Sequence, residues 1–291
     1  MALPTTEPFG PGSSVVLFGL ASAIAWGAGD FGGGMASRRG PVVGVSLVVQ
    51  ALGAVIAVGL ALVAAEPVPH PAALAVSVAA GLAVVVGILC LYHGLAVGRM
   101  GVVAPVTAVI AATMPVMFGI VRSGLPSTPV LAGIGLALVA VVLVSRVPAS
   151  GDGRSGIEFG IVGGIGIGLF NILIGELPKG LVFGPLVVVK VSAVIGVAVF
   201  AVLSRRAWRL PRGALSIALA AGLFDMSGNI FYVLATQAGR LDVAATLSSL
   251  YPVTTILLAI GLLGERITRH HAVGIAAAVA GIILISAGGG A

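Results

Sequence analysis

Ten apolar stretches, separated by short polar breaks, run along almost the whole chain and constrain its fold more than any other feature. Most of them reach the length of about 20 residues that an α-helix needs to cross the hydrocarbon core of a bilayer. The breaks hold the glycine, proline and arginine residues that are typical of turns. We therefore predict an all-α, polytopic membrane protein with ten transmembrane helices. The predicted spans are Val15–Met35, Pro41–Ala64, Ala72–Val97, Val102–Val121, Val130–Ser145, Gly156–Leu177, Leu181–Leu203, Gly213–Ala238, Val243–Leu263 and Ala272–Ala287.

The scarcity of charge supports the same prediction. Only 8% of the 291 residues are charged, whereas about 25% are charged in a typical soluble domain. The net charge of +6 does not indicate nucleic-acid binding, because the basic residues lie in short loops, where they influence orientation. We expect a multi-pass protein of the cell membrane (plasma or inner membrane), with the lipid bilayer and no nucleic acid among its partners.

The two halves of the chain resemble each other. When the second half is aligned on the first, with a register that drifts by a single position, small or polar residues repeatedly fall on similar ones. The matches are Phe18-Gly19 with Phe159-Gly160, Gly27 with Gly168, Asp30 with Asn171, Gln50 with Lys190, Ala80-Gly81-Leu82 with Ala221-Gly222-Leu223, Gly87 with Gly228, and Gly98-Arg99 with Gly239-Arg240.

These matches predict two repeats, over residues 15–146 and 156–287, after a disordered lead-in over residues 1–14. Each repeat holds five predicted helices, an odd number, so the second must be inserted upside down relative to the first. Inverted repeats are typical of secondary transporters, which bind their substrate near the bilayer midplane where the repeats meet.

Four polar residues share one face of the eighth span: Asp225, Asn229, Tyr232 and Thr236 follow each other at helical spacing. A carboxylate at this depth costs about 2.5–3.5 kcal/mol in hydrocarbon, so the face must point at protein or water. Two interpretations fit, a buried polar seam between packed helices or the wall of a substrate cavity. The number of polar groups favours the cavity.

Lys190 lies well inside the seventh span, too deep for its ammonium to reach the membrane surface easily. It needs a carboxylate or a water-filled space, and only Asp225 and Asp30 are carboxylates well inside spans. A structural salt bridge with Asp225 is one interpretation. The other is a cation in the cavity, which favours a substrate with a carboxylate or phosphate, or competes with a transported proton for the aspartate.

Four further side chains are candidates with open alternatives. Asp30 and Asn171 end matching stripes of small residues, which either pack beside a cavity or are plain packing seams. Trp26, one turn before Asp30, either stacks on a substrate or packs against helices. His93 in the third span is a structural residue or, less favoured, a proton relay.

Several short motifs resemble the EamA-like, ten-helix branch of the drug/metabolite transporter superfamily. They are Ala25-Trp26-Gly27, Leu250-Tyr251-Pro252, Leu263-Gly264-Glu265-Arg266 and the glycine-rich last span from Val273-Gly274 to Ser286. The resemblance implies two five-helix units around a central cavity and export or exchange of small metabolites. The first repeat departs from the pattern, because Gly124 occupies the position that matches Glu265.

The resemblance also implies that both termini lie in the cytoplasm. The basic residues predict the reverse, because loops after odd-numbered spans hold 11 of them and loops after even-numbered spans hold 3. The orientation therefore has two candidate answers, of which the distribution of basic residues is slightly favoured.

Secondary transport of a small organic solute, amino acid-like or drug-like, is the function that these observations predict. Protons are a candidate coupling ion, through Asp225 or Asp30. The chain has no Walker loop, HExxH, CxxC or GxSxG motif, so we expect neither an enzyme nor a cofactor or metal site. A non-transporting sensor or accessory subunit is the alternative, and an intramembrane lipid enzyme is less favoured. The candidate site residues are Trp26, Asp30, Gln50, His93, Asn171, Lys190, Asp225, Asn229 and Tyr232.

Overall fold

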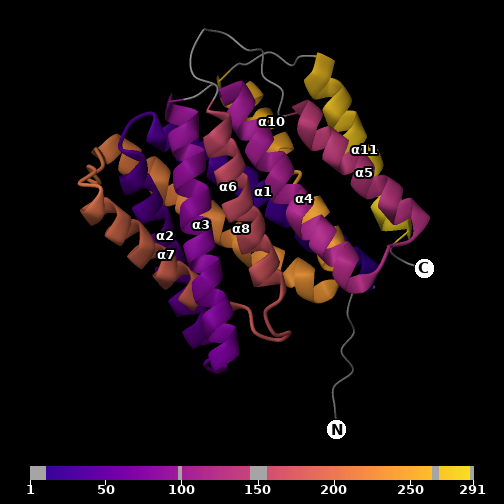
Figure 1. The fold of residues 1–291 in the computed structure, drawn as a ribbon, viewed down its shortest axis with the longest axis horizontal. Helices are drawn as coiled ribbons and strands as arrows, with labels where there is room; N and C mark the ends of the chain where they lie inside the picture. The colour runs from indigo at the N-terminus through magenta and orange to yellow at the C-terminus, as the bar shows by residue number, and fades with distance from the viewer. Residues whose placement is uncertain (1–10, 98–99, 145–155, 264–268, 289–291) are drawn as a thin grey trace.

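The computed structural model describes residues 11–97, 100–144, 156–263 and 269–288, in which every regular element is an α-helix (Figure 1). Within these ranges, eight spans are long and apolar enough to cross a membrane, and the shorter apolar helices α5 and α11 bring the number to ten. The predicted all-α, ten-span fold is confirmed. The helices are α1 (Pro11–Ser37), α2 (Val42–Val63), α3 (Pro71–Val97), α4 (Met100–Ser123), α5 (Thr128–Val144), α6 (Ile157–Gly175), α7 (Phe183–Leu203), α8 (Arg212–Ala238), α9 (Leu241–Ser248), α10 (Tyr251–Leu263) and α11 (Arg269–Gly288).

The start of the first helix differs from the prediction, and some predicted features lie outside the described residues. The first helix begins at Pro11, so residues 11–14 of the predicted lead-in belong to α1. Proline is well tolerated at the first position of a helix, where its missing N–H has no intrahelical acceptor. Residues 1–10 and Glu265 of the family motif lie outside the described residues.

The ninth span is two helices rather than the single predicted one. α9 ends at Ser248 and α10 begins at Tyr251, with Ser249 and Leu250 in a turn between them. Pro252 then lies in the first turn of α10, where a proline costs no helical hydrogen bond. Discontinuous membrane helices are common at the substrate sites of secondary transporters.

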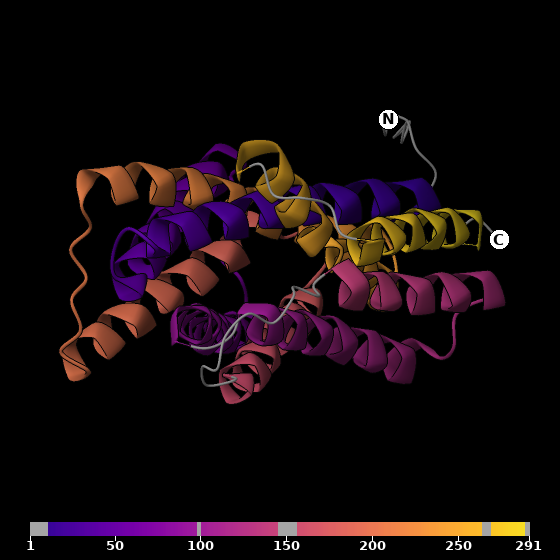
Figure 2. The same cartoon turned by 90° about the horizontal axis from the view of Figure 1, so that it is seen from above.

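Matching helices of the two halves pack on partners that also match each other. α1 packs on α8 and on α9–α10, as α6 packs on α3 and on α4. α2 packs on α8 as α7 packs on α3, and the counterpart helices α2 and α7 contact each other. α5 and α11 also form a counterpart pair, and Figure 2 shows them side by side. This pattern is the one that a two-fold relation between two five-helix units produces.

The symmetry extends to single contacts. Gly19 of α1 lies against Leu247 of α9, and Gly160 of α6 lies against Val106 of α4, so both partners occupy matching positions of the two halves. The other matched contacts are Gly81 with Ser192 and Gly222 with Leu52, and Gly87 with Ile167 and Gly228 with Trp26. The register predicted from the sequence therefore describes real packing positions.

Counterpart helices run in opposite directions. Gly53 in the middle of α2 lies against Lys190, whereas Glu66 just after α2 meets Val182 just before α7. The two helices are therefore antiparallel, and the contacts of α5 with α11 show the same relation. The second repeat is inverted relative to the first, as predicted.

Glu66 joins the two repeats at one face of the bundle. Its carboxylate accepts hydrogen bonds from the backbone N–H groups of Val182, Phe183 and Gly184 at 3.0, 2.8 and 2.8 Å. These are free N–H groups at the start of α7, where the helix dipole also favours a negative charge. The contact holds the first turn of α7 in place, and α7 is the helix that contains Lys190.

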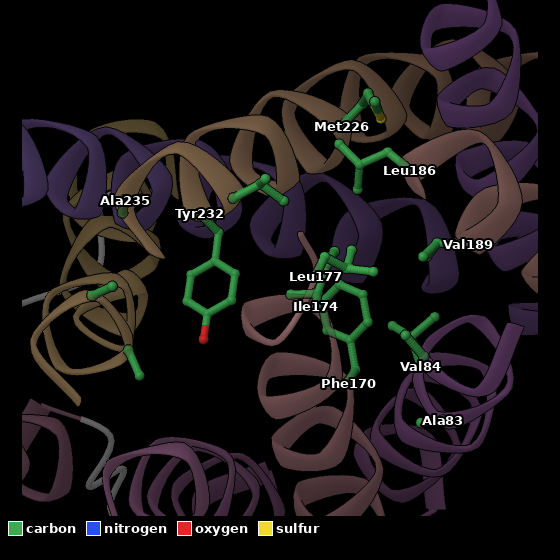
Figure 3. Close-up of a cluster of buried hydrophobic side chains, with 14 of the residues drawn as sticks. Ala83, Val84, Phe170, Ile174, Leu177, Leu186, Val189, Met226, Tyr232 and Ala235 are labelled. Carbon is green, nitrogen blue, oxygen red and sulfur yellow. The ribbon is translucent and has the colours of Figure 1, made fainter. Parts of the chain in front are cut away.

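The largest buried apolar cluster extends through most of the bundle, and its part labelled in Figure 3 lies where α3, α6, α7 and α8 converge. Leu186 of α7, Met226 of α8 and Ile174 of α6 are fully buried in it. Phe170 and Val84 extend the cluster toward α3 (Figure 3). This core holds the helices that carry the polar residues described below.

Candidate functional site

A cavity of about 60 Å³ lies between α1, α3, α4, α6, α8 and the break between α9 and α10. Five of the nine predicted site residues line it. The lining consists of Trp26, Asp30, Val84, Ile88, Ala111, Ala112, Ile167, Phe170, Asn171, Asp225, Asn229, Ser249 and Tyr251.

The lining divides into two chemically different walls. The polar wall comes from α1, α8 and the α9–α10 break and consists of Trp26, Asp30, Asp225, Asn229, Ser249 and Tyr251. The apolar wall comes from α3, α4 and α6 and consists of Val84, Ile88, Ala111, Ala112, Ile167 and Phe170, with Asn171 as a polar side chain among them. The two walls are built from helices that the repeat relates to each other.

Gln50, Lys190 and Asp225 form a chain of contacts behind the polar wall. The Lys190 ammonium donates to Gln50 Oε1 at 2.9 Å and to Asp225 Oδ2 at 2.5 Å. Lys190 and Gln50 are each only 1% exposed, whereas the Asp225 side chain keeps 20% of its surface accessible. The predicted match of Gln50 with Lys190 is thus a direct contact between α2 and α7. Lys190 itself does not line the cavity, and its charge is compensated by Asp225.

Asp30 is in a different situation from Asp225. It lines the cavity from α1 and is partly buried. Within the described part of the chain, its carboxylate has no hydrogen-bond or ion-pair partner. The two carboxylates of the cavity therefore differ, because one is paired with a lysine and the other is not.

The neighbouring polar side chains are held by backbone contacts. Asn229 donates to the Asp225 carbonyl of its own helix at 2.6 Å. The Tyr232 hydroxyl donates to the Asn171 carbonyl at 3.1 Å, and the Tyr232 ring packs on Trp26 with centroids 5.2 Å apart. Tyr232 is fully buried and supports Trp26 from behind rather than lining the cavity.

Asn171 contains a buried acceptor atom without a partner. The residue is 8% exposed and lines the cavity, and its Oδ1 accepts no hydrogen bond within the described part of the chain. Most buried polar atoms are hydrogen-bonded, so such an atom beside a cavity points to a bound molecule or water.

Two polar residues considered in the sequence lie elsewhere. His93 is not among the cavity residues, and its ring packs edge-on against Phe159 at 4.8 Å. Thr236 donates to the carbonyl of Val233 in its own helix at 2.8 Å. The polar face of the eighth span therefore contributes only its first half, Asp225 and Asn229, to the cavity.

Sequence reasoning did not identify Ser249 and Tyr251 as cavity residues. Both lie at the break in the ninth span, and Thr255 of the following turn donates to the Gly27 carbonyl at 3.1 Å, which ties α10 to α1. The signal available in the sequence was the group of polar residues Ser248, Ser249 and Tyr251 directly before Pro252, inside a predicted membrane span.

Comparisons with known proteins agree with this fold. The EamA-like transporter family matches residues 154–287, which correspond to the second repeat. A solved structure, described only as "Crystal structure of protein", has a TM-score of 0.75 and 15% sequence identity, over 94% of this chain and 96% of that one. That likeness concerns the fold alone. No curated protein matches the sequence. The chain is thus a multi-pass membrane protein whose second repeat matches the EamA-like transporter family, and the typically non-enzymatic members of that family carry out secondary transport of small solutes.

Proposed function

We propose that this protein exports or exchanges a small organic solute by alternating access around the cavity, and that Asp30 carries the coupling proton. The observation that carries the proposal is the contrast between the two carboxylates. Asp225 is paired with Lys190, whereas Asp30 faces the same cavity without a partner among the described residues. An uncompensated carboxylate at membrane depth is costly, so a proton or a cationic solute is needed to neutralise it.

The groups around Asp30 support this residue, rather than Asp225, as the site of proton exchange. Asp225 on α8 already has its counter-charge on α7, whereas the cavity side chains beside Asp30 on α1 and α10, Trp26 and Tyr251, carry no such charge. Lys190 is buried and held by two acceptors, so it is poorly placed to take up or release a proton during each cycle. Lys190 instead serves as the ion-pair partner of Asp225.

Alternating access is supported by the inverted repeats and by the position of the cavity between them. Two units related by a two-fold axis in the membrane plane can open to either face by equivalent movements. The broken ninth span adds a joint next to the cavity, at Ser249. The arrangement does not favour the interpretation that Lys190 attracts an anionic solute, because its ammonium lies behind Asp225.

The proposal is tested by following protons and solute together. A panel of toxic amino acid analogues and toxic amines, screened for resistance that depends on expression of the protein, supplies a transported solute. The purified protein is then placed in liposomes that contain a pH-sensitive dye. We expect a gradient of that solute to move protons in the opposite direction, and we expect Asp30→Asn to abolish this proton movement.

Glu158→Gln is the matched control, because it makes the same chemical change at an exposed position at the start of α6. It should transport as the unmodified protein does. Proton movement that persists in Asp30→Asn would exclude Asp30 as the proton site. Solute movement with no proton movement in the unmodified protein would exclude coupling.

A further inference from the structure

We infer that the solute is a protonated amine with an apolar body, whose ammonium group lies between Asp30 and Asn171 while its body lies on the apolar wall. The inference rests on the proposed transport function and names the class of solute. It follows from three independent properties of the cavity: its charge, the division of its walls and the unpartnered acceptor of Asn171.

The charge of the lining favours a cation. Among the described residues, the lining contains two carboxylates and no lysine, arginine or histidine. Lys190 compensates one of them, so the described site carries one net negative charge when Asp30 is ionised. Trp26 and Tyr251 add aromatic faces, which attract a cation that has left water. A carboxylate or phosphate would meet this negative charge and lose its own hydration.

The apolar wall determines the rest of the molecule. Opposite the carboxylates, Val84, Ile88 and Phe170 present hydrocarbon surface, and the small side chains of Ala111 and Ala112 leave room beside it. Such a wall offers no hydrogen bond to a second polar group of the solute. It favours a ring or branched alkyl group, because apolar surface is buried against it. The solute is therefore amphipathic, with its charge at one end.

Asn171 indicates that the cationic group of the solute is one that can donate hydrogen bonds. Its Oδ1 is buried, belongs to a cavity residue and has no donor within the described part of the chain. Asn171 and Asp30 occupy matching positions of the two repeats, on α6 and α1, so they approach the cavity from the two walls. A primary or secondary ammonium group supplies N–H donors to both oxygens, whereas a quaternary ammonium group supplies none.

The test measures binding with four probes that share a phenyl group: 2-phenylethylamine, its trimethylammonium derivative, 2-phenylethanol and 3-phenylpropionate. Trp26 lines the cavity and serves as a fluorescent reporter when the exposed Trp208 is replaced by Phe. We expect the amine to bind best, the quaternary compound and the alcohol at least about tenfold more weakly, and the carboxylate not at all, because charged hydrogen bonds are lost or repulsion appears.

Two variants link this order to the named atoms. Asn171→Leu should reduce the preference for the amine over the quaternary compound, and Asp30→Asn should reduce the preference for the amine over the alcohol. Glu158→Gln should change neither. The inference is overturned if the alcohol or the carboxylate binds as tightly as the amine, or if Asn171→Leu leaves the preference for the amine over the quaternary compound intact.

Binding in detergent needs neither a gradient nor transport, so this test is separate from that of the proposed function. If the amine binds but moves no protons across liposomes, proton coupling is wrong and the solute class stands. If another solute exchanges for protons while the amine does not bind, the solute class is wrong and the transport function stands.

Discussion

The two walls of the cavity occupy matching positions in the two repeats but differ in chemistry. When the halves are aligned, Asp225 corresponds to Val84, and Trp26 corresponds to Ile167. Each pair faces the same cavity from opposite sides. The repeat therefore preserves the backbone geometry of the site while it concentrates the charge on one side.

Packing positions behave in the opposite way. Gly19 and Gly160 make the same close contact in the two halves, and so do Gly87 and Gly228. A residue that lets two helices approach is needed twice, because the matching pairs of helices pack at equally close range. A residue that faces the cavity is needed once if, as we propose, the two walls meet the two different ends of one solute.

The largest difference between the halves is expected at the contact of α2 with α7. Lys190→Met removes the counter-charge of Asp225 and should cost about 3 kcal/mol of unfolding free energy, at the low end for a broken buried pair because Asp225 keeps some contact with the cavity. Gln50→Met at the matching position leaves the ion pair intact and should cost about half as much. Denaturation in mixed detergent micelles measures both.

The double variant Lys190→Met/Asp225→Val is the control, because it removes both charges and places the first-half residue type of Val84 in the second half. It should recover more than half of the stability lost in Lys190→Met, although it should not transport. Equal stability of Lys190→Met and the unmodified protein would show that the pair contributes nothing to folding.

A smaller loss of stability is expected from substitutions of the matched glycines Gly87 and Gly228. The loss of stability should be greater at Gly87, and the loss of solute binding should be greater at Gly228. A methyl group on Gly87 would meet the backbone nitrogen of Ile167 at 2.9 Å, so Gly87→Ala must separate α3 from α6 and should cost about 2 kcal/mol. At Gly228 the obstacle is the Trp26 side chain, which can turn. We expect Gly228→Ala to lower the free energy of unfolding less than Gly87→Ala does, as measured by denaturation in micelles. We expect it to reduce solute binding and transport more than Gly87→Ala does.

The reverse order, with greater instability in Gly228→Ala and weaker binding in Gly87→Ala, would mean that Trp26 is rigidly packed and does not respond to the solute. A serine at each position serves as the graded control, since it adds a similar volume with a hydroxyl group. It should reproduce the direction of each effect.

Much of the fold followed from periodicity and repetition, which depend on backbone geometry. The ten spans were predicted because each must be about 20 residues long to cross the bilayer. The correspondence of Gln50 with Lys190 followed from the repeat, and the structure shows in addition that the two residues are in contact, because matching positions on helices next to a two-fold axis face each other. Neither prediction needed the orientation of an individual side chain.

The candidate site was predicted less completely, because most helix faces here are equally apolar. Spacing placed Tyr232 with Asp225 on one face of α8, but the packing of the neighbouring helices decides which part of that face borders the cavity. His93 has neighbours that no local pattern reveals. The break at Ser249 depends on α10 docking against α1, which is a contact between residues far apart in the sequence.

The smallest predicted effects concern two hydrogen bonds that are copies of each other. Thr107 of α4 donates to the Gly160 carbonyl at 3.1 Å, and Ser248 at the end of α9 donates to the Gly19 carbonyl at 3.4 Å. Thr107→Val and Ser248→Ala each remove one interhelical hydrogen bond, worth about 0.6 kcal/mol in membrane proteins. Similar small losses in micelle denaturation, with unchanged transport, would show that the halves are equivalent wherever they only pack. A loss of transport in Ser248→Ala alone would instead extend the functional asymmetry from the cavity wall to the helix end beside the break.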